Sequence, residues 1–153
     1  MITLSELKKI IADYSINGDI KSDLNFAHQL FKVYDDFPEV SSLSGKCVHY
    51  SSGLQRYAKN FHNFNDFIYT KGGIQEIHTF LKCKTSDEGI QIIDPTLGGL
   101  IIYPQIFVGT RQKLEETFMD ERNHLILNGP LWGLNNKSPT RREYFDALYT
   151  EYY

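Results

Sequence analysis

Three residues in the sequence have side chains that could together carry out nucleophilic catalysis. Cys47 supplies a thiol, His78 an imidazole and Asp94 a carboxylate. A thiolate attacks a carbonyl carbon, an imidazole moves the proton, and a carboxylate fixes the tautomer of that imidazole. The three groups can perform acyl transfer only if the fold brings them to one point. Whether it does depends on the helix and the strands that carry them.

Cys47 stands directly before a stretch with helical periodicity. The segment CVHYSSGLQRYAKNF has apolar residues at helical spacing, namely Tyr50, Leu54, Tyr57, Ala58 and Phe61. We therefore expect Cys47 at the start of a helix. The unpaired N–H groups and the positive end of the helix dipole favour thiolate over thiol there, and a neighbouring imidazolium lowers the pKa of the thiol further.

His78 and Asp94 lie in two segments with the composition of β-strands. These segments, IQEIHTFLKCK and GIQIIDPT, are separated by TSDEG, which is typical of a turn. In an antiparallel hairpin whose paired residue numbers sum to 172, His78 lies directly opposite Asp94, and a sum of 174 places the two diagonally. Both registers put the side chains on one face, with His78 in the middle of its strand, whereas an odd sum would separate them.

Other interpretations of these residues were weighed against a triad. Cys83 has the opposite parity from His78, so it is expected on the other face of the strand in a structural role. A metal site built from Cys47, His78, Asp94 and Cys83 lacks the short paired spacing of zinc ligands, and no metal or cofactor is predicted. A lone cysteine is more often a small buried hydrophobic residue, so the triad depends on the conjunction of all three positions.

The surrounding segments predict an α+β fold in which the cysteine helix packs on an antiparallel sheet carrying the histidine and the aspartate. We predict a single domain, 1–153, with a helical N-terminal part (1–40), a catalytic core (44–118) and a C-terminal helix (138–153). The supporting patterns are helices at 3–14 and 22–36, strands at DFIYTK and PQIFVG, a helix at RQKLEETFMDER, and a last helix whose apolar side carries Tyr144, Phe145, Leu148 and Tyr152.

The composition is that of an ordinary globular protein. Of 153 residues, 41% are hydrophobic and 23% charged, and the net charge of −3 argues against a nucleic-acid partner. No apolar run approaches the roughly 20 residues that span a bilayer. The first residues, MITLSELKKIIADY, mix charges with apolar residues as an amphipathic helix does. We expect a soluble, cytoplasmic monomer with reduced thiols and no membrane partner.

The segments GKCVHYSSGLQRYAK, IHTFLK and IIDPT resemble the catalytic core of the papain-like and transglutaminase-like superfamily, where cysteine, histidine and aspartate come in this order. Asp-Pro-Thr followed by IFVGTRQKLEETF is most similar to bacterial effector and toxin domains that act as protein-glutamine deamidases. The resemblance covers roughly 44–118. It implies Cys47 as nucleophile, His78 as general base and acid, Asp94 as orienting residue, a glutamine-bearing protein as substrate, and delivery into a host or target cell.

The resemblance leaves the oxyanion donor and the reaction open. Several such relatives place a glutamine shortly after Asp-Pro-Thr, whereas this chain has Leu97, Gly98 and Gly99. The backbone N–H of Cys47 is then the remaining donor, and Asn25 or Gln29 could add an amide only if their helix folds over the site. The same thioester could serve a transglutaminase or a cysteine protease. A non-catalytic protein-binding module that has kept the fold is the alternative from another class.

Overall fold

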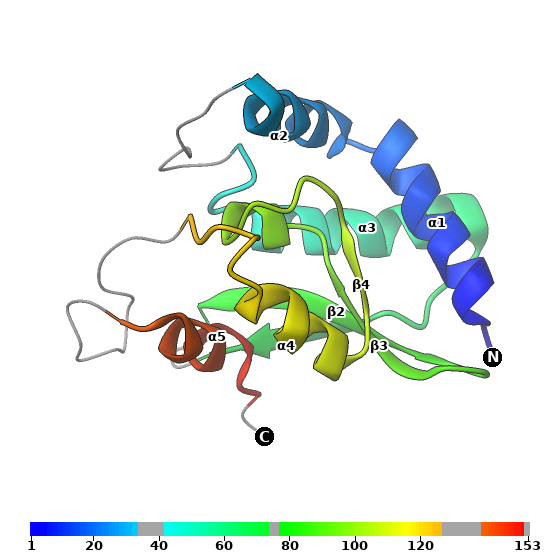
Figure 1. Ribbon diagram of the computed structural model, residues 1–153. Coiled ribbons are helices and arrows are strands. Elements are labelled where there is room, and N and C mark those ends of the chain that lie inside the picture. Colours follow the sequence, from blue (N-terminus) through cyan, green and yellow to red (C-terminus); the bar gives the residue numbers. More distant parts are fainter. Residues whose placement is uncertain (34–41, 74–76, 127–138, 152–153) are drawn as a thin grey trace.

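The computed structural model describes residues 1–33, 42–73, 77–126 and 139–151 (Figure 1). Within these ranges the chain forms five α-helices and a four-stranded antiparallel sheet, which confirms the predicted α+β class. In chain order the elements are α1 (Leu4–Asn17), α2 (Lys21–Val33), α3 (Cys47–His62), β1 (Ile68–Gly72), β2 (His78–Thr85), β3 (Gly89–Asp94), the 3-10 helix η2 (Leu97–Gly99), β4 (Phe107–Gly109), α4 (Arg111–Met119) and α5 (Arg141–Tyr149).

The sheet follows the chain, with strand order β1-β2-β3-β4. In the β2–β3 hairpin the pairs run from Thr85↔Gly89 to Leu81↔Ile93, so the paired numbers sum to 174. Gly89 has a φ of +71°, a conformation that glycine adopts without a steric penalty, and it closes the turn. The structure therefore contains the second of the two registers that place the histidine and the aspartate on one face.

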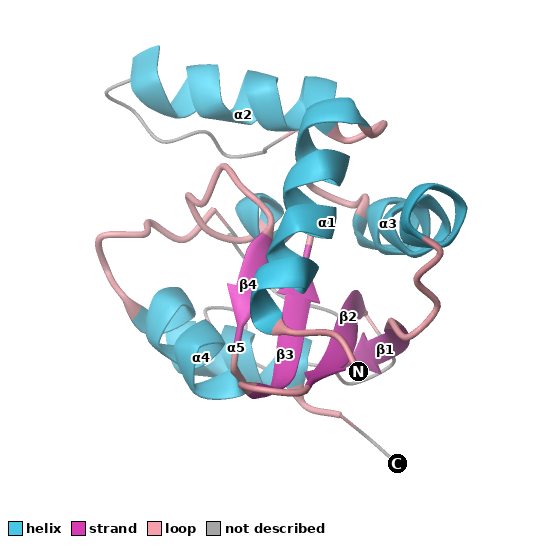
Figure 2. Cartoon of the chain, turned by 90° about the vertical axis from the view of Figure 1, so that its right-hand side faces the viewer, coloured by secondary structure: helices cyan, strands magenta, loops and turns pink. Residues whose placement is uncertain are grey.

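The two faces of the sheet bury separate apolar clusters because side chains alternate along each strand. The first cluster contains Leu81, Cys83 and Ile93 and is completed by α1, α2 and α3. The second contains Phe80 and Ile92 and is completed by α4 and α5. Figure 2 shows the sheet between α3 on one side and α4 with α5 on the other, while α2 lies beyond the layer of α1 and α3. Cys83 thus faces away from the second cluster, as its parity predicts.

Three helices begin with a threonine cap and α3 does not. The side chains of Thr3, Thr110 and Thr140 each accept a hydrogen bond from the first turn of α1, α4 and α5. The residue before α3 is Lys46, whose side chain makes no capping hydrogen bond. A lysine is not a capping residue, so the first N–H groups of α3, starting at Cys47, are not occupied by a side-chain cap.

The C-terminal helix is shorter than predicted. It ends at Tyr149, because Thr150 is extended (φ −70°, ψ 123°) and its carbonyl accepts a hydrogen bond of 2.7 Å from the backbone N–H of Gly73. Glu151 then forms an isolated antiparallel bridge with Gly72. The chain therefore leaves the helix to pair with the end of β1. Residues 152–153, including the predicted apolar Tyr152, lie outside the described residues.

Several predicted boundaries are also wrong. β2 begins at His78, so the histidine opens its strand; residues 74–76 lie outside the described residues. β4 is confined to Phe107–Gly109, because Pro104 lacks an N–H and Gln105 bonds back to the carbonyl of Tyr103 in a tight turn. α1 ends at Asn17, three residues after its predicted end at residue 14. α2 is described as far as Val33, so the last part of that predicted helix, 34–36, lies outside the described residues.

None of the described helices combines the length and the apolar character needed to cross a membrane.

Candidate active site

His78 and Asp94 form a buried pair at one end of the sheet. Nε2 of the imidazole lies 2.7 Å from Oδ2 of the carboxylate. Their side chains are only 3% and 0% exposed, respectively. The histidine is the first residue of β2 and the aspartate the last of β3, so the antiparallel pairing brings them together diagonally. The contact expected from the hairpin register is present.

Cys47 reaches the same imidazole from the other side of the sheet's end. Its partly exposed thiol lies beside His78 and the backbone of Thr79, close enough for both to shift its pKa. Because Nε2 faces Asp94, Nδ1 is the ring nitrogen left for the sulfur. One turn into α3, the buried Ser51 donates to the carbonyl of Thr79 at 3.3 Å and holds the helix against β2 beside the histidine. The structure therefore brings all three predicted site residues together.

The contacts between these groups outweigh the effect of burial on their ionisation. Burial alone would raise the pKa of Cys47, but the hydrogen bond and the positive charge of His78 lower it overall. Burial would likewise lower the pKa of His78, but the charge and hydrogen bond of Asp94, with those of Cys47, raise it to about 10. Both shifts favour an ion pair of thiolate and imidazolium over the neutral thiol and imidazole.

The carboxylate of Asp94 is held by hydrogen bonds at both oxygens. Oδ1 accepts from the backbone N–H of Thr96 at 3.0 Å, and Oδ2 accepts from the hydroxyl of Tyr149 at 2.6 Å as well as from His78. Burial, followed by the charge of Asp94, raises the pKa of Tyr149 well above 10, so this phenol stays protonated and donates. These bonds fix the direction in which the carboxylate faces the imidazole.

Thr96 and Tyr149 were not predicted from the sequence as partners of Asp94. A signal for Thr96 was available, because an aspartate often accepts from the backbone two residues on, and Asp-Pro-Thr offers that turn. Tyr149 follows the buried Phe145 by four residues, which predicts that it is buried too. No local pattern predicts that it reaches a carboxylate 55 residues earlier in the chain.

Backbone N–H groups at the start of α3 are available to a bound oxyanion. The first helical hydrogen bond runs from the N–H of Tyr50 to the carbonyl of Lys46 at 3.0 Å, so the N–H of Cys47 precedes the helical ladder. After Asp-Pro-Thr, η2 offers only a buried leucine and two glycines, without an amide side chain. Asn25 and Gln29 are both exposed on α2, and we assign neither to the site.

The glycines of η2 allow close packing against the loop that precedes Cys47. A Cβ at Gly99 would lie 3.0 Å from backbone atoms of Ser44, and one at Gly98 would meet the carbonyl of Tyr103. Ser44 Oγ also donates to the carbonyl of Gly99 at 3.3 Å. The glycines therefore let η2 approach the loop before Cys47 closely, which helps to place the start of α3.

Two further histidine–aspartate pairs differ from the His78–Asp94 pair in exposure and in partners. His49 lies 3.0 Å from Asp19 and His62 lies 2.6 Å from Asp13, but all four side chains are more than a quarter exposed. Only the His78 pair is buried and also contacts a thiol. Among the described residues, no group of three or more histidine, cysteine, aspartate or glutamate side chains is arranged to hold a metal ion.

No family model matches the chain. No curated protein is significantly similar to it, and no solved structure is either. The case for a function therefore rests on the geometry of Cys47, His78 and Asp94.

Proposed function

We propose that the chain is a cysteine hydrolase of papain-like or transglutaminase-like design that deamidates a glutamine side chain of a partner protein. The observation that carries this proposal is the buried His78–Asp94 pair in contact with the partly exposed Cys47 at an uncapped helix start. A candidate nucleophile, a proton carrier and an orienting carboxylate meet at one point, and the pKa shifts of Cys47 and His78 favour the ion pair that thiol catalysis uses.

The reaction proceeds through a thioester. The thiolate of Cys47 attacks the carboxamide carbon of the substrate, and the backbone N–H of Cys47 donates to the oxyanion that forms. The imidazolium of His78 transfers its proton to the nitrogen, and ammonia leaves as the thioester forms. Neutral His78 then takes a proton from water, whose oxygen attacks the thioester. The thiolate and imidazolium re-form, the carboxylic acid product leaves and loses its proton to solvent, and Asp94 keeps the imidazole in place throughout.

A protruding side chain fits the position of the nucleophile. The residues on either side of Cys47, which are Gly45, Lys46, Val48 and His49, are all exposed, so the sulfur lies at an outward end of its helix. A γ-carboxamide on the surface of a folded partner can approach such a point. The choice of glutamine follows from the resemblance of Asp-Pro-Thr and IFVGT to effector deamidases, and with it comes the proposal of a bacterial effector or toxin delivered into a target cell.

Mass spectrometry of a cell extract incubated with the protein tests this proposal. We expect a gain of about one dalton at a partner glutamine, the result of amide hydrolysis through a thioester, with wild-type protein and not with Cys47→Ala. Addition of a fluorescent primary amine distinguishes transamidation, because the label would join the same glutamine. New chain termini that depend on Cys47 would instead identify a protease. An unmodified extract together with an unreactive Cys47 would identify a binding module.

A further inference from the structure

The last helix contributes a side chain to the candidate triad. The hydroxyl of Tyr149 and Nε2 of His78 bond to the same oxygen, Asp94 Oδ2, at 2.6 Å and 2.7 Å. The tyrosine is fully buried, and its ring meets that of His78 edge to face, with centroids 5.1 Å apart and planes at 83°. Tyr149 thus contacts both residues that would control the proton.

The position of Tyr149 is held by two neighbouring elements. Its carbonyl accepts a hydrogen bond of 2.9 Å from Arg111 Nη1 at the start of α4. The next residue, Thr150, accepts from the backbone of Gly73, just beyond β1. The end of α5 is therefore tied to α4 on one side and to the sheet on the other, with the tyrosine at the junction.

The glycines at the end of β1 match this docking. A Cβ at Gly72 would clash with the carbonyl of Leu148, and one at Gly73 would clash with the carbonyl of Ala147. Gly73 also has a φ of +89°, which side-chain-bearing residues rarely adopt. The backbone of α5 approaches the sheet where these two glycines admit it, so the docking of its last turn is a specific feature of the fold.

From these contacts we propose that Tyr149 is a positioning residue of the triad, whose hydroxyl orients the Asp94 carboxylate toward His78 and balances part of its charge. The end of α5 is then part of the active site. This inference rests on the proposed function, because it assigns a role within the same proton-transfer site. A purely structural tyrosine would occupy the same space without influencing the two ionisable groups of the mechanism.

The charges around His78 determine the direction in which the pKa values of His78 and Cys47 should move when the hydroxyl of Tyr149 is removed. The groups that face the imidazole are Cys47 from α3, Asp94 from β3 and Tyr149 from α5, while Arg111 from α4 bonds to the tyrosine's carbonyl. A donor to Oδ2 disperses its negative charge. Without that donor, Asp94 holds the imidazolium proton more tightly and raises the pKa of the nearby thiol. The loss of the hydroxyl should therefore move both titrations to higher pH.

Tyr149→Phe and Tyr14→Phe form a matched pair of variants. Tyr14 is 1% exposed and donates to Asp19 Oδ1 at 2.6 Å, but it lies in the cluster on the other face of the sheet. Each variant loses one hydrogen bond from a buried tyrosine to an aspartate, buried at Asp94 and partly exposed at Asp19. We would measure the pH dependence of Cys47 alkylation by iodoacetamide and follow the His78 ring by NMR. Tyr149→Phe should raise both midpoints by about half a pH unit or more, and Tyr14→Phe should leave them at the wild-type values.

A second substitution covers the case in which Tyr149→Phe does not fold. Site-specific 3-fluorotyrosine at position 149 keeps the hydroxyl and makes it a stronger donor, so both midpoints should move to lower pH. Unchanged midpoints with 3-fluorotyrosine, or equal shifts in the two phenylalanine variants, would overturn the inference. An ordinary thiol profile in the wild-type protein would contradict the proposed function instead, and that result is visible before any variant is compared.

Discussion

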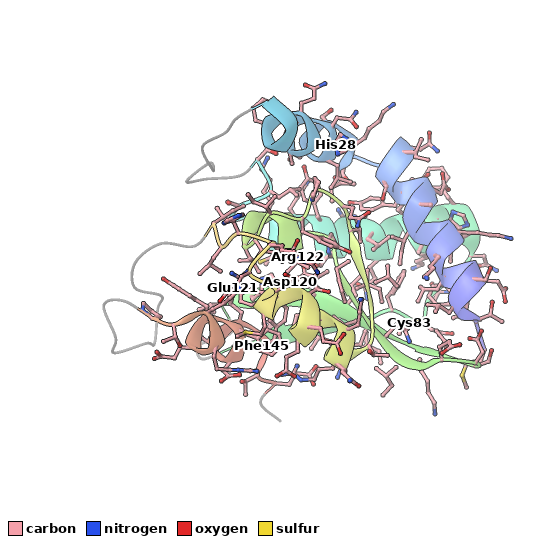
Figure 3. All side chains as sticks on the ribbon, in the orientation of Figure 1. His28, Cys83, Asp120, Glu121, Arg122 and Phe145 are labelled. Atoms are coloured by element: carbon pink, nitrogen blue, oxygen red, sulfur yellow. The ribbon has the colours of Figure 1, made fainter. Side chains whose placement is uncertain are left out.

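Cys47 and Cys83 carry the same side chain in opposite surroundings. Cys47 opens α3, is partly exposed, and has a pKa lowered by His78 in spite of burial. Cys83 lies within β2, is 0% exposed, and has a pKa raised to about 11 by burial and then by the charge of Asp66. In Figure 3 it lies toward the β2–β3 turn, away from Phe145 on α5. The difference teaches that an imidazole and a helix start, rather than the thiol itself, create the candidate nucleophile.

The largest expected effect comes from removal of the thiol. Cys47→Ala should abolish Cys47-dependent modification of protein glutamines, because no other group at the helix start can form the thioester. The fold should remain, since a partly exposed side chain at a helix start contributes little packing. Modification of an extract, measured by mass spectrometry, together with far-UV circular dichroism, checks both halves. Retained activity in Cys47→Ala would show that Cys47 is not the nucleophile.

Removal of the imidazole should make Cys47 resemble Cys83. In His78→Gln, burial still raises the pKa of the thiol while the charge and hydrogen bond that lower it are gone. The alkylation rate at pH 7 should then fall about tenfold or more, which corresponds to at least one pKa unit. The rate is measured by quenching the alkylation reaction at a series of times and determining the intact mass of the protein. A rate equal to that of the wild type would remove His78 from the explanation.

The raised pKa of His78 should appear in the pH dependence of stability. A group whose pKa is raised by folding stabilises the native state fully below its unfolded pKa, about 6.5, and this contribution is lost as the pH rises toward 10. Cys47 titrates in the opposite sense, so both proteins in the comparison carry Cys47→Ala. In urea unfolding, the single variant Cys47→Ala should be more stable than the double variant that also carries His78→Gln. This difference in the free energy of unfolding should decline across this pH window. A constant difference would contradict the buried pair with Asp94.

The smallest effect is expected at the other cysteine. Cys83→Ala should leave the alkylation rate of Cys47 and the activity unchanged, because Cys83 faces the cluster of α1 and α3. It should lower the free energy of unfolding by about 1 kcal/mol, since a buried sulfur is replaced by a smaller group. Urea unfolding measures this cost. Equal loss of activity from both cysteine substitutions in folded proteins would point to a shared role of the two thiols.

Local patterns predicted the elements of the site but not the contacts that complete it. Helical periodicity placed Cys47 at a helix start, and period-two parity separated Cys83 from His78, because both signals are contained within one element. The pairing of Asp94 with His78 followed only for an even register, which the sequence did not fix, and the structure has the register whose paired numbers sum to 174. The contact with Tyr149 depends on how α5 docks beyond β1, which is a tertiary property.

The same limit explains the misplaced boundaries. The last segment has a helical pattern up to its end, yet the chain turns away after Tyr149 because Gly73 and Gly72 offer backbone partners there. Similarly, nothing in the sequence around His78 shows that the strand starts at that residue. At the end of α5, a partner distant in sequence overrides a local preference.

The pH profile of Cys47 alkylation tests the central claim most directly. The chain has two cysteines, so in Cys83→Ala the iodoacetamide rate reports Cys47 alone. A thiolate stabilised by His78 should give an alkylation profile shifted to clearly lower pH than that of an ordinary thiol. A single rise centred at about pH 8.5 or higher, as for an ordinary or merely buried thiol, would contradict the account.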